Sequence, residues 1–257
     1  MIGLYNSLQT VKKILKKVLK RIYQIFLYFK FLADYLIFQK IQKQDFRFQS
    51  VKLTECKPCL QDATKKTGFD RHYIYHTAWL ARVLQTTRPQ KHVDISSILY
   101  VPGIISAFIP MDYYDFRPPN LQLDNLKVGH ADLTKLPFAN ENINSLSCLH
   151  SLEHIGLGRY GDSIDPFGDI KAAGELTRVI AKGGNLFIVV PIGKPRIIYN
   201  AHRIYSYFQI IEMFSSFNIF EFSLIPDDEN LSIIRNADSS LVENQKYACG
   251  CFWFKKK

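Results

Sequence analysis

The hydrophobic positions between residues 91 and 257 form short continuous runs that alternate with segments of helical periodicity. Three runs, residues 92–95, 143–149 and 186–190, are rich in strand-forming residues and contain almost no charged positions. Such runs predict strands that are buried on both faces of a parallel sheet. Apolar residues at helical spacing over 170–180 and 205–217 predict helices, and Lys182-Gly183-Gly184 predicts the stop of the first of them.

Further strands are predicted at residues 111–116, 219–224 and 246–254. The stretch between the first strand and residue 111 has room for one helix that crosses the sheet. The predicted order is β-α-β-α-β-α-β with an antiparallel tail, which is typical of an α/β domain. We therefore expect one α/β domain over residues 91–257, a helical lead-in over 49–90 and a separate extension over 1–48.

The N-terminal extension is patterned as a basic amphipathic helix. Apolar residues recur at helical spacing and lysines fall on the other side, at positions 12, 13, 16, 17 and 20. Residues 1–43 hold nine basic residues against one acid, and this difference of +8 supplies most of the net charge of +10. The pattern indicates contact with an anionic membrane surface through residues 10–40. Packing on the main domain and a membrane-spanning segment are the alternatives.

Charge and cysteine content narrow the class of protein. Outside the N-terminal extension the chain is nearly neutral, so no nucleic-acid partner is expected. Five cysteines argue against a disulfide framework and favour a reducing compartment. The Cys56-x-x-Cys59 motif has no second pair at zinc-ribbon spacing, so no metal site is expected. We expect a cytoplasmic protein, with peripheral attachment to the inner face of a membrane as a further alternative.

Polar residues close the predicted parallel strands. In an open α/β sheet the ligand crevice lies beyond the carboxyl ends of the strands. The candidate residues that follow the first four strands are Asp94, Ser96, Ser97, Asp115, Asp132, Leu133, His150, Glu153 and His154. The sequence therefore predicts a ligand site built from these strand ends.

Residues 131–191 read as strand, loop, helix, Gly-Gly turn and strand, and they resemble the second half of the S-adenosylmethionine (SAM) binding domain of class I methyltransferases. The resemblance implies a Rossmann-like, mostly parallel sheet with an antiparallel last strand, and SAM as cofactor. It implies that Asp115 binds the ribose hydroxyls and that Asp132, in the pattern D-x-x-x-L-P-F, lies by the adenine amino group. The other implied cofactor-binding residues are Asp94, Ser96, Ser97, Leu133 and His150. Ser96 departs from the family, which has glycine in this turn.

Two loops, residues 154–166 and 200–205, follow the fourth and fifth predicted parallel strands. They resemble a methyltransferase-like family of unknown function that is associated with surface-polysaccharide gene clusters. The loops offer polar groups suited to a hydroxyl-rich or anionic substrate: Arg159, Tyr160, Asp162, Asp165, His202 and Arg203. A folding role for each of these residues is the alternative.

A catalytic base is expected at the start of the first loop. His154 is the candidate, with Glu153 as its orienting partner, because an imidazole titrates near neutrality. The segment His150 to His154 also matches H-x-x-E-H, a zinc-hydrolase pattern, but that pattern requires a helix and glycines follow directly. We expect a SAM-dependent methyltransferase that acts on a hydroxyl of a sugar, glycan or glycolipid precursor. The alternative is a non-catalytic binding or scaffold protein that keeps the fold without using SAM.

Overall fold

A computed structural model describes the backbone of residues 2–257 and the side chains of residues 11–257. The chain divides into two compact units, Met1–Gly68 and Phe69–Lys257. The boundary falls inside the expected lead-in over residues 49–90. Of that segment, only the short 3-10 turn η1 (Leu53–Glu55) and the helix α2 (Arg71–Thr87) are helical, and α2 belongs to the second unit.

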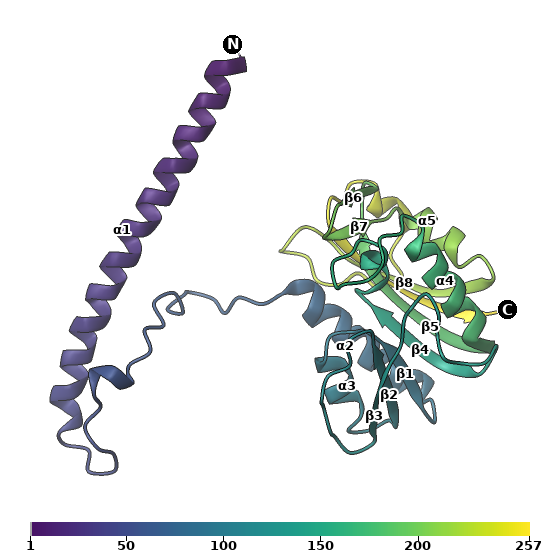
Figure 1. Cartoon of the computed structure of the whole chain (residues 1–257), viewed down its shortest axis with the longest axis horizontal. Helices are drawn as coiled ribbons and strands as arrows, with labels where there is room; N and C mark the ends of the chain where they lie inside the picture. Colours follow the sequence, from purple (N-terminus) through teal and green to yellow (C-terminus); the bar gives the residue numbers. More distant parts are fainter. Residues whose placement is uncertain (1) are drawn as a thin grey trace. The chain divides into compact units, whose positions relative to one another are not determined.

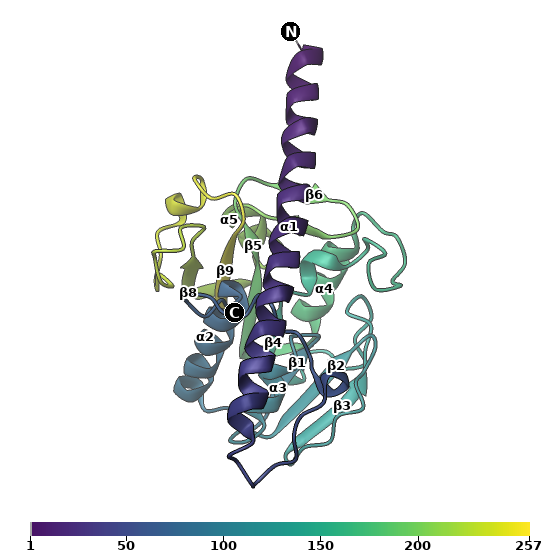
Figure 2. The same ribbon diagram turned by 90° about the vertical axis from the view of Figure 1, so that its left-hand side faces the viewer.

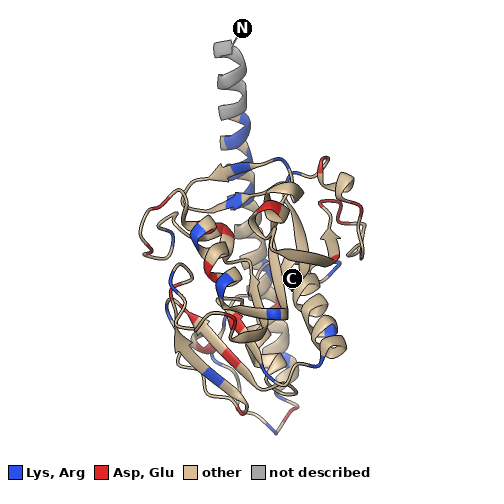
Figure 3. Cartoon of the chain, turned by 90° about the vertical axis from the view of Figure 1, so that its right-hand side faces the viewer, with Lys and Arg blue, Asp and Glu red and all other residues tan. Residues whose placement is uncertain are grey.

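The first unit consists of the long helix α1 (Ile2–Gln42) and the chain that turns back along its end. The return is held by Val51, whose carbonyl accepts a hydrogen bond from the Tyr35 hydroxyl at 3.2 Å and whose amide donates to Gln42 Oε1 at 3.1 Å. Apolar side chains along α1 are exposed, for example Leu15 at 56% and Phe29 at 65%. Lysine and arginine positions recur along the same helix (Figure 3). Within the described residues, no helix combines the length and the apolar character needed to cross a bilayer.

The second unit is built on a seven-stranded sheet in the order β3-β2-β1-β4-β5-β9-β8 (Figures 1 and 2). The strands are β1 (His92–Ile95), β2 (Met111–Asp115), β3 (Leu126–His130), β4 (Ile143–Leu149), β5 (Ile180–Ile192), β8 (Phe217–Ile225) and β9 (Ala248–Lys256). Strands β1 to β5 are parallel, whereas β9 pairs antiparallel with both β5 and β8. The predicted α/β fold with an antiparallel tail is confirmed.

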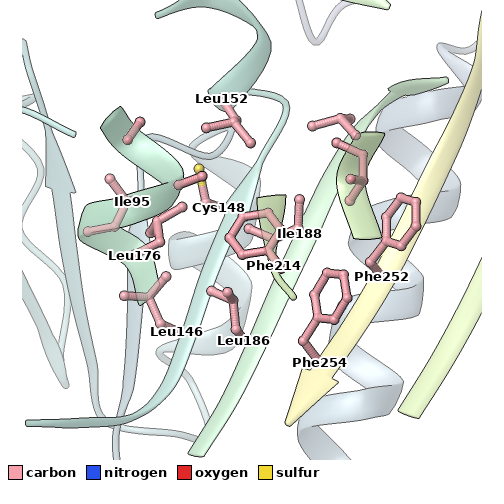
Figure 4. Close-up of a cluster of buried hydrophobic side chains, with 14 of the residues drawn as sticks. Ile95, Leu146, Cys148, Leu152, Leu176, Leu186, Ile188, Phe214, Phe252 and Phe254 are labelled. Atoms are coloured by element: carbon pink, nitrogen blue, oxygen red, sulfur yellow. The ribbon is translucent and has the colours of Figure 1, made fainter. Parts of the chain in front are cut away.

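Helices cover both faces of this sheet, and alternate side chains of the central strands feed two hydrophobic cores. On one face α4 (Gly168–Val179) and α5 (Tyr207–Met213) pack over Leu186 and Ile188 of β5. This core also takes Phe252 and Phe254 of β9 (Figure 4). On the other face α2 and α3 (Tyr100–Ile105) pack over residues such as Phe187 of β5. Burial on both faces explains why the central strands read as continuous apolar runs.

Parts of the predicted order are wrong. No helix lies between β2 and β4, where the alternating pattern calls for one; residues 116–125 and 131–142 connect these strands and β3 without a helix. Lys182-Gly183-Gly184 does not stop a helix, because α4 ends at Val179 and the glycines lie in β5. The pairing of β4 with β5 shifts its register there, and Gly183 has a φ of +72°. The glycines thus accommodate a bulge rather than a helix end.

Three strands lie outside the predicted ranges: β3 and the two strands of a short hairpin. Strands β6 (Arg196–Ile198) and β7 (His202–Ile204) form a separate antiparallel hairpin after β5. The hairpin carries two of the residues that the sequence assigned to substrate binding, His202 and Arg203. The expected helix over residues 205–217 is shorter in the structure: α5 begins after its capping residue Ser206 and ends at Met213, and Phe217 already begins β8.

Candidate active site

A cavity of about 520 Å³ lies at the carboxyl ends of β1, β2 and β4. This volume lies within the usual range for small-molecule sites, roughly 300–1,000 Å³. The cavity brings together six of the seven expected cofactor-binding residues: Ser96, Ser97, Asp115, Asp132, Leu133 and His150. The seventh, Asp94, is fully buried and does not line the cavity.

Asp115 ends β2 and is held in a fixed orientation. Its Oδ1 accepts a hydrogen bond from the Arg117 amide at 2.7 Å, and its Oδ2 accepts one from the Tyr113 hydroxyl at 3.2 Å. A carboxylate oxygen can accept two hydrogen bonds, so each oxygen keeps capacity for a ligand. The side chain is therefore preorganised to accept hydrogen bonds from two neighbouring hydroxyl groups.

Asp132 lies on another wall of the cavity, two residues after the end of β3. Its Oδ1 accepts hydrogen bonds from the amide and the hydroxyl of Thr134, at 2.8 and 2.7 Å. This turn leaves Oδ2 without a hydrogen bond inside the described part of the protein. The next residue, Leu133, is buried and supplies apolar surface to the same wall.

Ser96 adopts the backbone conformation that glycine favours. Its φ is +58°, in the left-handed region. The turn is fixed by two hydrogen bonds, from the Ser96 amide to the Tyr114 carbonyl at 2.7 Å and from the Ser151 hydroxyl to the Ser96 carbonyl at 2.7 Å. The chain thus keeps the shape of a glycine turn with serine in it, and the cavity stays open beside it.

We predict that Ser96→Gly stabilises the α/β unit by about 1 kcal/mol, because a left-handed non-glycine residue costs roughly that amount. Chemical unfolding followed by circular dichroism measures the change. Ser97→Gly is the matched control and should destabilise, since the Ser97 hydroxyl bonds to Asp94 at 2.7 Å. A destabilised Ser96→Gly variant would show that the serine side chain is needed in the turn.

Asp94 is completely buried and supports the turn instead of lining the cavity. Its carboxylate accepts hydrogen bonds from the Ser97 amide, the Ser97 hydroxyl and the Ser147 hydroxyl. Burial raises the pKa of Asp94 to about 6, against the lowering effect of these hydrogen bonds. Asp94 therefore positions Ser96 and Ser97 rather than meeting a ligand.

The raised pKa predicts a pH-dependent stability. Because the folded state holds the Asp94 proton up to about pH 6 and the unfolded state releases it near 3.8, the stability contribution is present at low pH and is lost as the pH rises between these values. Relative to Asp94→Asn, the native chain should lose about 3 kcal/mol between about pH 4 and pH 7. Urea unfolding at several pH values measures this. Parallel pH profiles of the two proteins would contradict it.

A second cavity, of about 600 Å³, adjoins the first. The two share four residues of their walls: Tyr73, His150, His154 and Tyr160. The second cavity is further lined by Asp70, His72, Glu153, Arg159, Asn200, Ala201, His202 and Tyr247. It is therefore rich in hydrogen-bonding groups and aromatic rings.

His154 lies in the wall between the two cavities. Its Nδ1 lies 2.6 Å from the Ala201 carbonyl, which can only accept a hydrogen bond, so Nδ1 carries the proton. Nε2 is then unprotonated and is a possible proton acceptor. Burial lowers the pKa of His154, although the charge of Glu153 acts in the opposite direction. The ring is therefore a neutral base near neutral pH.

Glu153 is almost completely buried, at 1% exposure, between two histidines. Its Oε1 lies 2.8 Å from His150 Nδ1 and 3.7 Å from His154 Nε2. Burial raises the pKa of Glu153, but His150 and His154 outweigh this effect and the pKa is lowered overall. The side chain is thus an ionised acceptor that orients His150. His154 is the last residue of a single 3-10 turn, η2 (Leu152–His154), and His150 precedes that turn. No α-helix joins the two histidines, so the H-x-x-E-H zinc-hydrolase geometry is absent from this described segment.

Five of the six expected substrate-binding residues line one or both cavities. Arg159 and His202 line the second cavity, and Tyr160 lines both, with the guanidinium groups of Arg117 and Arg159 at 4.6 and 5.0 Å from its ring centroid. Asp162 and Asp165 line the first cavity. Arg203 lines neither.

Asp162, Asp165 and Arg203 hold the loop after η2. Asp162 accepts hydrogen bonds from backbone amides, including that of Gly156 at 2.7 Å, and Asp165 pairs with Lys171 at 2.6 Å. Arg203 is 4% exposed and donates to the carbonyls of Ile155 and Pro166, at 2.7 and 3.2 Å. Its guanidinium is thus used within the protein, which explains why it does not reach a cavity.

Sequence reasoning missed the residues that α2 contributes. Asp70, His72 and Tyr73 come from the start of α2, and Tyr247 precedes β9. The start of α2 meets the carboxyl end of β4 only through tertiary packing. The one signal available in the sequence is the pair His72 and His76, one helical turn apart.

The fold is shared with solved structures. A Galdieria sulphuraria protein, provisionally assigned as a sarcosine dimethylglycine methyltransferase, is 13% identical, with a TM-score of 0.52 over 72% of this chain and 85% of that one. The fold is that of a class I methyltransferase.

Two more solved structures match with lower scores. The N-methyltransferase NodS of Bradyrhizobium japonicum, solved with S-adenosyl-L-homocysteine, is 9% identical, with a TM-score of 0.49 over 70% of this chain and 85% of that one. The YcgJ protein of Bacillus subtilis is 13% identical, with a TM-score of 0.48 over 71% and 98%.

The match to a sequence family covers a shorter part of the chain than the structural matches do. Residues 134–248 match the family described as "Caenorhabditis protein of unknown function, DUF268". This match begins after Asp115 and Asp132 and includes both loops around the second cavity. No curated protein matches the chain.

Proposed function

We propose that this protein is a SAM-dependent methyltransferase that methylates a hydroxyl group of a sugar, glycan or glycolipid precursor. One observation carries the proposal. A cavity with two preorganised carboxylates, Asp115 and Asp132, adjoins a second polar cavity through a wall that contains His154.

The first cavity fits an adenosyl group by its chemistry. Asp115 offers acceptors for ribose hydroxyls, and the open oxygen of Asp132 suits an exocyclic amine. The left-handed turn at Ser96 gives this wall of the cavity the backbone shape of a glycine turn. SAM would supply an electrophilic methyl group there, and the protein's task is to align an acceptor with it and to exclude water.

The second cavity suits a hydroxyl-rich acceptor. Its wall combines carboxylate, imidazole, guanidinium and amide groups with the rings of Tyr160 and Tyr247, a mixture that can hydrogen-bond and stack on a sugar. His154 Nε2 is the group that would accept the hydroxyl proton, because Nδ1 is committed to the Ala201 carbonyl.

Equilibrium binding tests the cofactor part of the proposal. Isothermal titration of the full chain with S-adenosylhomocysteine should show one site of micromolar affinity, and ATP should fail to displace it. Absence of binding would favour a scaffold that keeps the fold without the cofactor. Methyl transfer from radiolabelled SAM to a panel of sugars and glycolipids then tests the acceptor class.

We further propose that α1 attaches the protein to an anionic membrane. Its exposed apolar residues would enter the interface and its lysines would face the anionic headgroups. Each lysine near such a surface contributes about 1 kcal/mol, so replacing Lys12, Lys13, Lys16, Lys17 and Lys20 by glutamine should weaken binding to phosphatidylserine vesicles by at least about tenfold. Sedimentation measures binding, with phosphatidylcholine vesicles as control. Equal pelleting of the native and substituted chains would overturn this proposal.

A further inference from the structure

Three side chains with metal-binding atoms converge beside the second cavity. His72 comes from α2, His150 follows β4, and Cys249 lies in β9. One ligand atom from each lies within 4.8 Å of the other two. His72 and His150 line the second cavity, whereas Cys249 is fully buried behind them.

The distances suit a tetrahedral metal ion. Cys249 Sγ lies 3.4 Å from His150 Nε2. In tetrahedral zinc sites the bonds to nitrogen and sulfur place these two ligand atoms about 3.5 Å apart. A small side-chain rotation of His72 would complete the set, because its nitrogen already lies within the 4.8 Å limit of both partners.

His150 is already oriented as a metal ligand. Its Nδ1 lies 2.8 Å from Glu153 Oε1, so Nδ1 carries the proton and Nε2 points its lone pair at Cys249. Ligating histidines in metal sites commonly donate their second ring N–H to a carboxylate in this way. Glu153 therefore supplies the outer hydrogen bond that such a site requires.

The surroundings contain buried polar atoms without partners. Among the described residues, the buried side-chain nitrogen and oxygen atoms that lack a hydrogen bond are His76 Nδ1 and Nε2, Glu153 Oε2 and His202 Nε2. The His76 ring lies 5.1 Å from that of His150, and Glu153 and His202 line the second cavity. Buried polar groups are nearly always satisfied in native proteins, so their concentration here points to a ligand at this cluster.

We propose that His72, His150 and Cys249 bind a zinc ion whose fourth coordination position opens to the second cavity. One thiolate with two imidazoles favours zinc over magnesium and calcium, which prefer oxygen ligands. In the metal-free protein the Cys249 thiol donates to His150 Nε2; zinc takes the place of that proton, which is released to solvent. The three ligands come from segments that are far apart in the sequence, so no spacing motif predicts this site.

Metal titration of the full chain tests the site. Each protein is prepared with Cys56→Ser and Cys59→Ser, so that the Cys56-x-x-Cys59 motif cannot bind the added metal. After treatment with a chelator, calorimetric titration should show one tightly bound zinc ion with proton release, and cobalt(II) should give a sulfur-to-cobalt charge-transfer band. Magnesium should not bind there.

Substitutions assign the ligands. Loss of a residue that only hydrogen-bonds to a metal ligand typically weakens metal binding roughly 10–100-fold. Cys249→Ser and His72→Ala remove direct ligands, so each should weaken zinc binding by more than about 100-fold. Cys249→Ser should also abolish the charge-transfer band. Cys251→Ser, which replaces another buried cysteine of β9, is the matched control and should retain both signals.

His72 is only partly buried, so His72→Ala gives a folded variant even if Cys249→Ser proves unstable. Zinc binding that is unaffected by both substitutions, or absent from the native chain, would overturn the proposal. The titration contains only metal ions, so its outcome is independent of whether S-adenosylhomocysteine binds.

Discussion

Asp115→Ala should weaken the binding of S-adenosylhomocysteine by about 100-fold or more. The carboxylate offers both oxygens to the first cavity, and a hydrogen bond to a charged group contributes about 1.5–3 kcal/mol. The loss of two such bonds amounts to about 3 kcal/mol at least, which corresponds to a factor of more than 100 in affinity. Isothermal titration of both proteins measures the change.

Two companion variants separate this effect from damage to the fold. Asp115→Asn retains an acceptor for the Arg117 amide and should lose only about tenfold, because a neutral hydrogen bond is weaker than a charged one. Asp124→Ala removes the same charge from the exposed loop before β3 and should bind as the native chain does. Native affinity in Asp115→Ala would remove Asp115 from the cofactor site.

Gly156→Ala should destabilise the α/β unit by about 4 kcal/mol and disrupt the loop after η2. Gly156 has a φ of +80°, and an added Cβ would lie 2.0 Å from the Asp165 carbonyl oxygen. The left-handed backbone costs an alanine about 1 kcal/mol, and the forced displacement adds about 3 kcal/mol. The displaced segment includes Asp165, which lines the first cavity, so ligand affinity should fall as well.

Gly174→Ala is the control for this substitution. Gly174 lies within α4, and no atom outside its own helix comes within 4 Å of the added Cβ. Alanine is the better helix former, so this variant should be neutral or more stable by up to about 1 kcal/mol. Urea unfolding monitored by circular dichroism compares the two. Equal stability of both variants would mean that the 156–168 loop adapts without cost.

The strands and the two cavity carboxylates could be predicted because their signals are local. Strands buried on both faces appear in the sequence as short runs with few charged residues, and β1 and β4 match the predicted ranges. Asp115 and Asp132 were found because each closes a strand at the edge of the sheet where ligands bind. The left-handed turn at Ser96 was not predicted, since serine rarely adopts that conformation and the hydrogen bonds that enforce it come from Tyr114 and Ser151.

The second cavity depends on tertiary packing and was predicted only in part. His202 was identified as a polar residue of the second loop, but the hairpin of β6 and β7 that presents it has too few residues for a periodic signal. Arg203 is the next residue in the chain, but its side chain faces the interior and donates hydrogen bonds to backbone carbonyls. The sequence does not distinguish these two orientations. The contribution of α2 could not be predicted, because the helical pattern indicates which face is apolar but not which strand ends its first turn will meet.

Because Tyr73, His150, His154 and Tyr160 belong to the walls of both cavities, we expect ligand binding in one cavity to affect binding in the other. A compound that fixes these side chains from one side changes the free energy of binding on the other, and such coupling is reciprocal. Cooperativity therefore offers a route to the acceptor that needs no enzymatic assay: candidate sugars can be screened for those that tighten the binding of S-adenosylhomocysteine.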